Sequence, residues 1–101
     1  MSTSMLKLPA VARMDDAPAV WASLQAGLRA EAAQVKSAAG GMVTLSAAEL
    51  RDFDSSALSL LLSAKRWGSE EGVNLQISDA PEQLLELARL YGVAELIWPA
   101  A

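Results

Sequence analysis

The feature of this sequence that most restricts its fold is the alternation of short strand-like runs with amphipathic helical segments. Residues 42–45 form a short apolar run, Met-Val-Thr-Leu, that is typical of a buried strand. Residues 73–78 alternate apolar and polar side chains with a period of two, which indicates a strand with one face on the core. Because helical segments precede, separate and follow these runs, the pattern predicts an α/β fold in which helices cover a sheet.

Apolar residues at helical spacing predict three helices. The first runs over residues 20–35, and two aspartates directly upstream are expected to cap it and to complement its dipole. The second begins at residue 54 or 55 and ends before a glycine-bracketed polar turn at residues 68–72. A capping box that starts at Asp79 opens the third helix, and Gly92 is its expected C-cap.

The remaining segments carry weaker signals. Residues 5–9 predict a marginal first strand, and residues 93–98 predict one more short strand at the end of the domain. Gly40-Gly41 breaks the chain before the run at residues 42–45. An apolar stripe in the third helix includes Tyr91.

Composition limits the chemistry that the chain can carry. Its 101 residues, 52% of them hydrophobic, suffice for one compact core and are too few for two, so residues 1–101 are expected to form a single domain. The chain has no cysteine and no histidine, which removes thiolate nucleophiles, the usual partner of a serine nucleophile and the commonest transition-metal ligand. We therefore expect no enzymatic activity, no cofactor and no metal site.

Charge and hydropathy narrow the class of partner. Eight basic residues against 12 acidic ones give a net charge of -4, which argues against binding to the phosphates of DNA or RNA and favours protein partners. Residues 1–9 lack a basic segment followed by an apolar one, and no apolar run approaches the ~20 residues that span a bilayer. The sequence therefore predicts a cytoplasmic protein that does not insert directly into a membrane.

The stretch that invites a functional interpretation is DFDSSALSLLL at residues 52–62, where two carboxylates and two hydroxyls precede a leucine-rich helix. In one interpretation Asp54 or Ser55 is only an N-cap, which stabilises a helix by about 1 kcal/mol. In the other, Ser55 lies among the unpaired N–H groups of the first turn, so that its hydroxyl, or a phosphate on it, is presented at the surface. Trp67 also leaves two alternatives open, packing in the core or an exposed anchor for a partner.

These segments together resemble a STAS domain, the fold of anti-sigma-factor antagonists. The resemblance rests on Asp-Ser-Ser-Ala-Leu at 54–58, Asn-Leu-Gln-Ile at 74–77 and Leu-Leu-Glu-Leu-Ala-Arg-Leu-Tyr-Gly-Val at 84–93. It is strongest over residues 42–98, and the segment at 87–93 is most similar to the MlaB-type STAS subunits of Mla phospholipid ABC transporters. The resemblance implies a STAS-like (SpoIIAA-like) α/β fold, with a small mixed β-sheet and helices packed against it.

The MlaB-type branch implies a non-enzymatic cytoplasmic subunit that binds the ATPase of a transporter maintaining outer-membrane lipid asymmetry in Gram-negative bacteria. Such a subunit is peripheral to the inner membrane through its partner. Whether exposed strand edges support a homodimer is left open by the sequence. The residues expected to contact the partner belong to the loop before the second helix and the loop after the strand at 73–78, namely Asp54, Ser55, Ser56, Ser78, Asp79 and Ala80.

The antagonist branch implies another role for the same surface. There the first serine after the aspartate is phosphorylated by an anti-sigma factor kinase, and that serine corresponds to Ser55. Antagonists usually carry a glycine after the paired serines, whereas this chain has Ala57, and its N-terminus leaves no room for a full leading hairpin. Both departures favour the transporter-type interpretation, with a switch by phosphorylation of Ser55 as the alternative.

Overall fold

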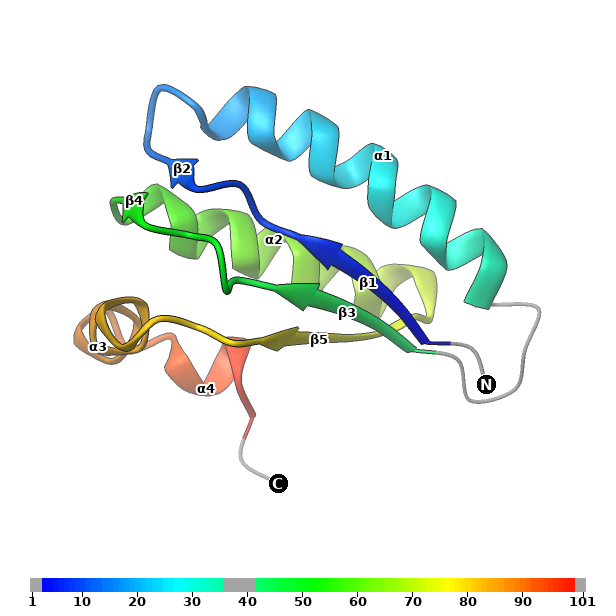
Figure 1. Cartoon of the computed structure of the whole chain (residues 1–101). Coiled ribbons are helices and arrows are strands. Elements are labelled where there is room, and N and C mark those ends of the chain that lie inside the picture. Colours follow the sequence, from blue (N-terminus) through cyan, green and yellow to red (C-terminus); the bar gives the residue numbers. More distant parts are fainter. Residues whose placement is uncertain (1–2, 36–41, 100–101) are drawn as a thin grey trace.

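The computed structural model describes residues 3–35 and 42–99, and every structural statement below refers to this part of the chain. Figure 1 shows helices packed against a small sheet of nearly aligned strands. In chain order the elements are β1 (Thr3–Lys7), β2 (Val11–Ala12), α1 (Ala17–Val35), β3 (Met42–Ser46), β4 (Asp52–Phe53), α2 (Ser56–Glu71), β5 (Asn74–Ser78), α3 (Glu82–Leu90) and α4 (Ala94–Ile97).

Most of the predicted elements are present. The three helices are confirmed as α1, α2 and α3, and the runs at residues 42–45 and 73–78 are confirmed as β3 and β5. The marginal first strand is β1, shifted toward the N-terminus from the predicted residues 5–9. The predicted break at Gly40-Gly41 lies outside the described residues.

Parallel pairing joins all the described strands. The main sheet has the order β1-β3-β5, with Leu45 opposite both Leu6 and Ile77, and β2 pairs with β4 in a second small sheet. A parallel neighbour requires a crossover connection, which α1 supplies between β1 and β3 and α2 supplies between β3 and β5. Within the described residues the sheets are therefore parallel throughout, not mixed as the resemblance implied.

The apolar face of the main sheet packs under a layer of two helices. α1 lies over β1 and β3, α2 lies over β5, and the two helices contact each other (Figure 1). On β5 the alternate residues Asn74 and Gln76 are exposed, so the period of two marks one buried and one open face. The largest side chains without exposed surface come from the sheet and from all four helices: Leu28, Val43, Leu45, Leu61, Leu84 and Ile97.

The polar turn predicted at residues 68–72 is wrong, because α2 continues through it and ends only at Gly72. Gly68 lies inside the helix, where a Cβ atom would be 3.1 Å from the Cβ atom of Leu75 and 3.1 Å from the carbonyl oxygen of Val73. The glycine therefore permits a close approach between α2 and β5 and does not break the helix.

The strand predicted at residues 93–98 is also wrong, because this segment contains the short helix α4. α3 ends in a Schellman arrangement around Gly92, whose φ is +72°, and the N–H of Val93 donates to the carbonyl of Ala88 at 2.9 Å. This confirms the glycine expected at the end of α3. The turn directs the chain so that α4 packs against α2 and α3, which buries Ile97.

Two aromatic residues illustrate the limits of local patterns. Trp67 is only 9% exposed, so of its two interpretations core packing is the correct one. Tyr91 belongs to the apolar stripe of the third helix, yet it follows the last residue of α3 and is 58% exposed. Its ring is thus available at the surface.

Gly68 and Gly27 provide a matched test of the contact between helices and sheet. Gly68→Ala should lower the melting temperature, because the new methyl group meets a Cβ atom and a backbone oxygen that cannot easily move. Gly27→Ala should be neutral or stabilise by up to about 1 kcal/mol, since its methyl group meets only the flexible end of Leu6 at 3.3 Å. Thermal unfolding followed by circular dichroism measures both variants, and equal effects would contradict the close approach at Gly68.

Candidate functional site

The two loops predicted to contact a partner follow strands that end on one side of the molecule. One loop joins β4 to α2, and the other joins β5 to α3. Figure 1 shows β4, the beginning of α2 and α3 at the same end, where the parallel strands terminate. We call this region the carboxyl-end surface and define it by the residues Asp54, Ser55, Ser56, Ser78, Asp79 and Ala80.

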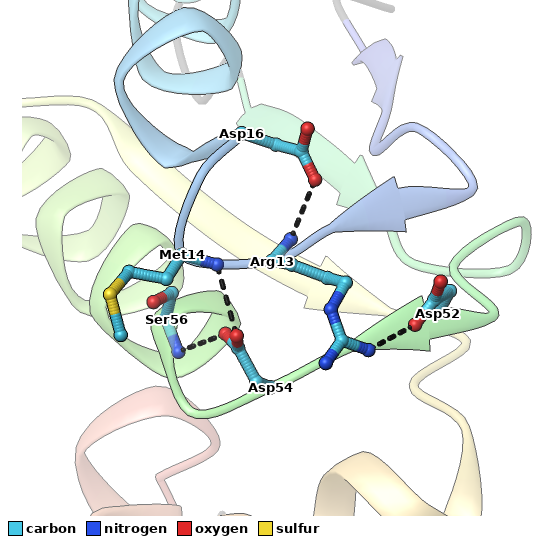
Figure 2. A network of polar contacts seen from close by, with 6 residues as sticks. All are labelled: Arg13, Met14, Asp16, Asp52, Asp54 and Ser56. Carbon is cyan, nitrogen blue, oxygen red and sulfur yellow. Dashed lines mark hydrogen bonds and ion pairs between the residues drawn. The ribbon is translucent and has the colours of Figure 1, made fainter.

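The carboxylate of Asp54 organises the first loop. Its Oδ2 atom accepts a hydrogen bond from the backbone N–H of Met14 at 3.0 Å, and its Oδ1 atom accepts one from the backbone N–H of Ser56 at 2.9 Å (Figure 2). Both bonds stabilise the ionised form, the bond from Met14 more than the bond from Ser56. They therefore lower the pKa of Asp54 below its usual value. One side chain therefore ties the beginning of α2 to a segment 40 residues earlier.

Ser55 stands at the N-terminal boundary of α2, and its side chain is exposed. It makes no side-chain bond to the helix end, so of the two predicted caps it is Asp54 whose side chain bonds an N–H of the first turn. Ala57 and Leu58 follow immediately and are buried in the core. The Ser55 side chain thus lies at the surface, on a turn that Asp54 anchors.

Arg13 orients the segment that faces Asp54. Its Nη1 atom donates to Oδ1 of Asp52 at 2.6 Å, which raises the pKa of Arg13, and its backbone N–H donates to the carboxylate of Asp16 at 3.1 Å (Figure 2). The predicted cap of α1 is therefore wrong for Asp16, whose carboxylate bonds backward into the preceding loop. Since the Arg13–Asp52 pair is exposed, it orients the loop more than it stabilises the fold.

The second loop is built around Asp79, whose φ of +58° lies in the left-handed region that non-glycine residues seldom adopt. Its Oδ2 atom accepts hydrogen bonds from Oγ of Ser78 at 3.2 Å and Oγ of Ser46 at 3.4 Å. The predicted capping box is therefore wrong, because the carboxylate bonds hydroxyls at the ends of β3 and β5. Pro81 precedes α3 and the helix has no side-chain cap.

The two loops share one end of the molecule but are built separately. Within residues 3–35 and 42–99, no hydrogen bond or ion pair joins Asp54, Ser55 or Ser56 to the loop of Asp79. Ser55 and Asp79 are exposed, and the other four members of the carboxyl-end surface are half-buried. A partner that contacts both loops must therefore span them.

Sequence reasoning missed the neighbours of Asp54. The side chain of Met14 lies beside the Asp54 loop (Figure 2) and is 71% exposed. Val11 on β2 is exposed as well. No clear pattern marks these residues, because β2 and β4 are only two residues long and pair across 41 positions of the chain. A second group of exposed apolar side chains lies at the end of α3 and on α4: Leu90, Tyr91 and Leu96.

The sequence also matches a known protein family. The family model described as MlaB, STAS domain matches residues 1–98. The chain belongs to the STAS domain family. The match confirms the STAS-like α/β fold and extends well beyond residues 42–98, where the resemblance is strongest in the sequence. No curated protein matches the chain.

The carboxyl-end surface of this STAS domain presents hydroxyls and hydrogen-bonded carboxylates. Both oxygens of Asp54 accept backbone hydrogen bonds, and Asp79 accepts bonds from two hydroxyls. The described residues include no group of three or more acidic side chains placed to hold a metal ion. No helix in residues 3–35 or 42–99 combines the length and the apolar character that a bilayer crossing needs.

The hydrogen bonds of Asp54 predict a pH dependence of stability. Because its pKa is lower in the folded than in the unfolded chain, its contribution is present above about pH 4 and is lost as the pH falls through the folded value. Asp54→Asn keeps one acceptor oxygen of two, so it should melt a few degrees below wild type near pH 7. The difference should be smaller near pH 2 than near pH 7, because lowering the pH toward and through the folded pKa of Asp54 removes the charge that these bonds stabilise.

Thermal unfolding of wild type and Asp54→Asn at both pH values measures this effect. Asp15→Asn is the matched control, because it removes one exposed carboxylate from the neighbouring loop. A difference between wild type and Asp54→Asn that is the same at both pH values would contradict the stabilising role of the charge.

The left-handed conformation of Asp79 gives a second test of the site. Asp79→Gly and Asp79→Ala both remove the carboxylate, but only glycine adopts a φ of +58° without strain. The glycine variant should be more stable than the alanine variant by about 1 kcal/mol. Urea unfolding compares the two directly, and equal stabilities would show that the left-handed conformation is not retained.

Proposed function

We propose that this STAS domain is a non-enzymatic subunit that binds and regulates the ATPase of a phospholipid ABC transporter of the Mla type, which maintains outer-membrane lipid asymmetry. The observation that carries the proposal is the exposed hydroxyl of Ser55 on a turn held by Asp54. The description of the matching family model, MlaB, supports the transporter branch. In this proposal the domain is cytoplasmic and peripheral to the inner membrane through its partner.

The geometry suits a docking surface in two respects. The turn is organised before binding, because Asp54 bonds the Met14 and Ser56 N–H groups, so little conformational entropy is lost when a partner orders it. The side chains at the tip are small, which lets a partner backbone approach the helix end closely. Stable interfaces bury about 800 Å² on each partner, so contacts must extend beyond Ser55 to the Asp79 loop or to exposed Met14.

Charge indicates the chemistry of the partner surface. Asp54 lies in the first loop, two residues after Asp52, and Asp79 lies in the second loop. Arg13 is already paired with Asp52. The ATPase should therefore present hydrogen-bond donors or basic side chains to this region. Added negative charge at Ser55 should weaken binding, because it increases repulsion within an already acidic surface.

The alternative function is an anti-sigma-factor antagonist switched by phosphorylation of Ser55. The observation in its favour is that the Ser55 side chain is exposed and makes no capping bond, so that a kinase could reach it. A phosphate there would carry a charge of about -1.5 to -2 beside the ionised Asp54 carboxylate. The switch would then act by repelling a partner and would not need a new fold.

A pull-down from the native host decides between the two. Tagged wild type should recover an ABC ATPase and its permease, and Ser55→Asp should recover at least about tenfold less of both. Ser69→Asp is the control, because it adds the same charge to an exposed position near the opposite end of α2. Mass spectrometry of the Ser55 peptide should find no phosphate. Recovery of a small kinase together with phosphate on Ser55 would contradict the transporter assignment and favour the antagonist.

A further inference from the structure

The two edges of the main sheet differ in how their backbone groups are satisfied. The backbone groups of Ser78 point toward β3, because its carbonyl accepts a hydrogen bond from the Ala47 N–H. The backbone groups of the alternate residues Leu75 and Ile77 therefore point toward the outer edge of β5. Side chains satisfy the carbonyls of these two residues. Nζ of Lys65 donates to the carbonyl oxygen of Leu75 at 2.9 Å, and Nε1 of Trp98 donates to the carbonyl oxygen of Ile77 at 3.0 Å. The β5 edge is thereby protected against further strand pairing.

The β1 edge is not protected in this way. Leu8 N–H donates to the Ser46 carbonyl at 2.8 Å, so the even-numbered residues of this segment face β3 and the backbone groups of Thr3, Met5 and Lys7 face outward. Among residues 6–34 and 42–99, no side chain bonds the outward backbone groups of Lys7. Unpaired donors and acceptors at this spacing are a template for one more strand.

An apolar groove accompanies this open edge. It has a volume of about 600 Å³ and lies between β1 and the flank of α1. Leu6, Leu8, Val20 and Leu24 form its apolar lining, and the small residues Ala19 and Ser23 stand exposed at its rim. The only ionic groups in its lining, Lys7 and Glu49, pair with each other at 3.3 Å, so the groove has no net charge to repel another copy.

We infer that the β1 edge and its groove bind a second copy of this chain. An antiparallel pair of β1 strands centred on Met5 places Met5 opposite Met5 and Thr3 opposite Lys7. All of these residues direct their backbone groups outward, so each opposed pair exchanges two hydrogen bonds. Lys7 then faces a threonine and not a second lysine, so the edge is self-complementary under two-fold symmetry.

The helix layer fits the same symmetry. α1 packs over both β1 and β3, so we place its axis between these two strands, about half a strand spacing inward from β1. With strands about 4.8 Å apart, the two α1 helices of a dimer would be separated by about 10 Å, the distance at which packed helices touch. The small residues Ala19 and Ser23 on the facing flank allow that approach, and the contact would close the groove over the paired strands.

Sedimentation velocity of the purified full chain tests this inference between low micromolar and about 0.5 mM protein. Wild type should shift with concentration from the 10.6 kDa monomer toward twice that mass. Met5→Pro removes one outward N–H and leaves the bonds to β3 intact, so it should raise the dimer dissociation constant at least about tenfold. Met5→Val keeps the N–H and should leave the constant unchanged.

A second pair of variants on α1 keeps the test decisive if proline unfolds β1. Ser23→Glu places a charge in the groove, whereas Ala22→Glu places it on the adjacent exposed residue, turned about 100° away around the helix. Ser23→Glu should abolish the dimer and Ala22→Glu should retain it, with equal circular dichroism spectra for both. A wild type that stays monomeric throughout, or a dimer that survives Ser23→Glu, would overturn the inference.

Discussion

The pairing of β3 with both of its neighbours is the interaction on which the rest of the structure depends. β3 is bonded along both edges and buried on both faces, so that even Thr44 and Ser46, on the face away from α1 and α2, are nearly inaccessible. Because both neighbours are parallel to it, the three strands terminate together and their following loops emerge at one end. The carboxyl-end surface follows from this topology, as binding sites do in parallel α/β sheets.

Two carboxylates then give those loops a defined shape. Asp54 bonds a backbone N–H that is 40 residues away in sequence, and Asp79 bonds a hydroxyl that is 33 residues away. In each case one bond comes from a neighbouring residue and the other from a distant part of the fold, so the loop's own sequence does not position it alone. Asp79 stays in a left-handed conformation because its bonds to Ser78 and Ser46 hold it there.

This difference between local and long-range determinants explains what the sequence could predict. Periodicity identified β3, β5 and the three main helices, because burial of one face repeats at the period of the element. The sequence pattern failed at Gly68, because a glycine at that point suggests a turn, whereas this glycine lies within a helix and leaves room for Leu75. It failed at Asp79, whose partner Ser46 is remote, and it gave no sign of Met14 beside Asp54. The stretch at residues 52–62 singles out Ser55 as a cap or a presented hydroxyl, and only the resemblance to the family adds partner contact or phosphorylation as its expected role.

The proposed dimer and the proposed docking surface use different sides of the sheet, and their geometry is linked. The carboxyl-end surface lies where the strands terminate, whereas the β1 edge runs alongside them (Figure 1). Two β1 strands that pair in antiparallel fashion direct their carboxyl ends in opposite directions. A dimer would therefore leave both surfaces accessible but could not place them on one flat partner. One partner would occupy one copy, and the second copy would remain free to bind another.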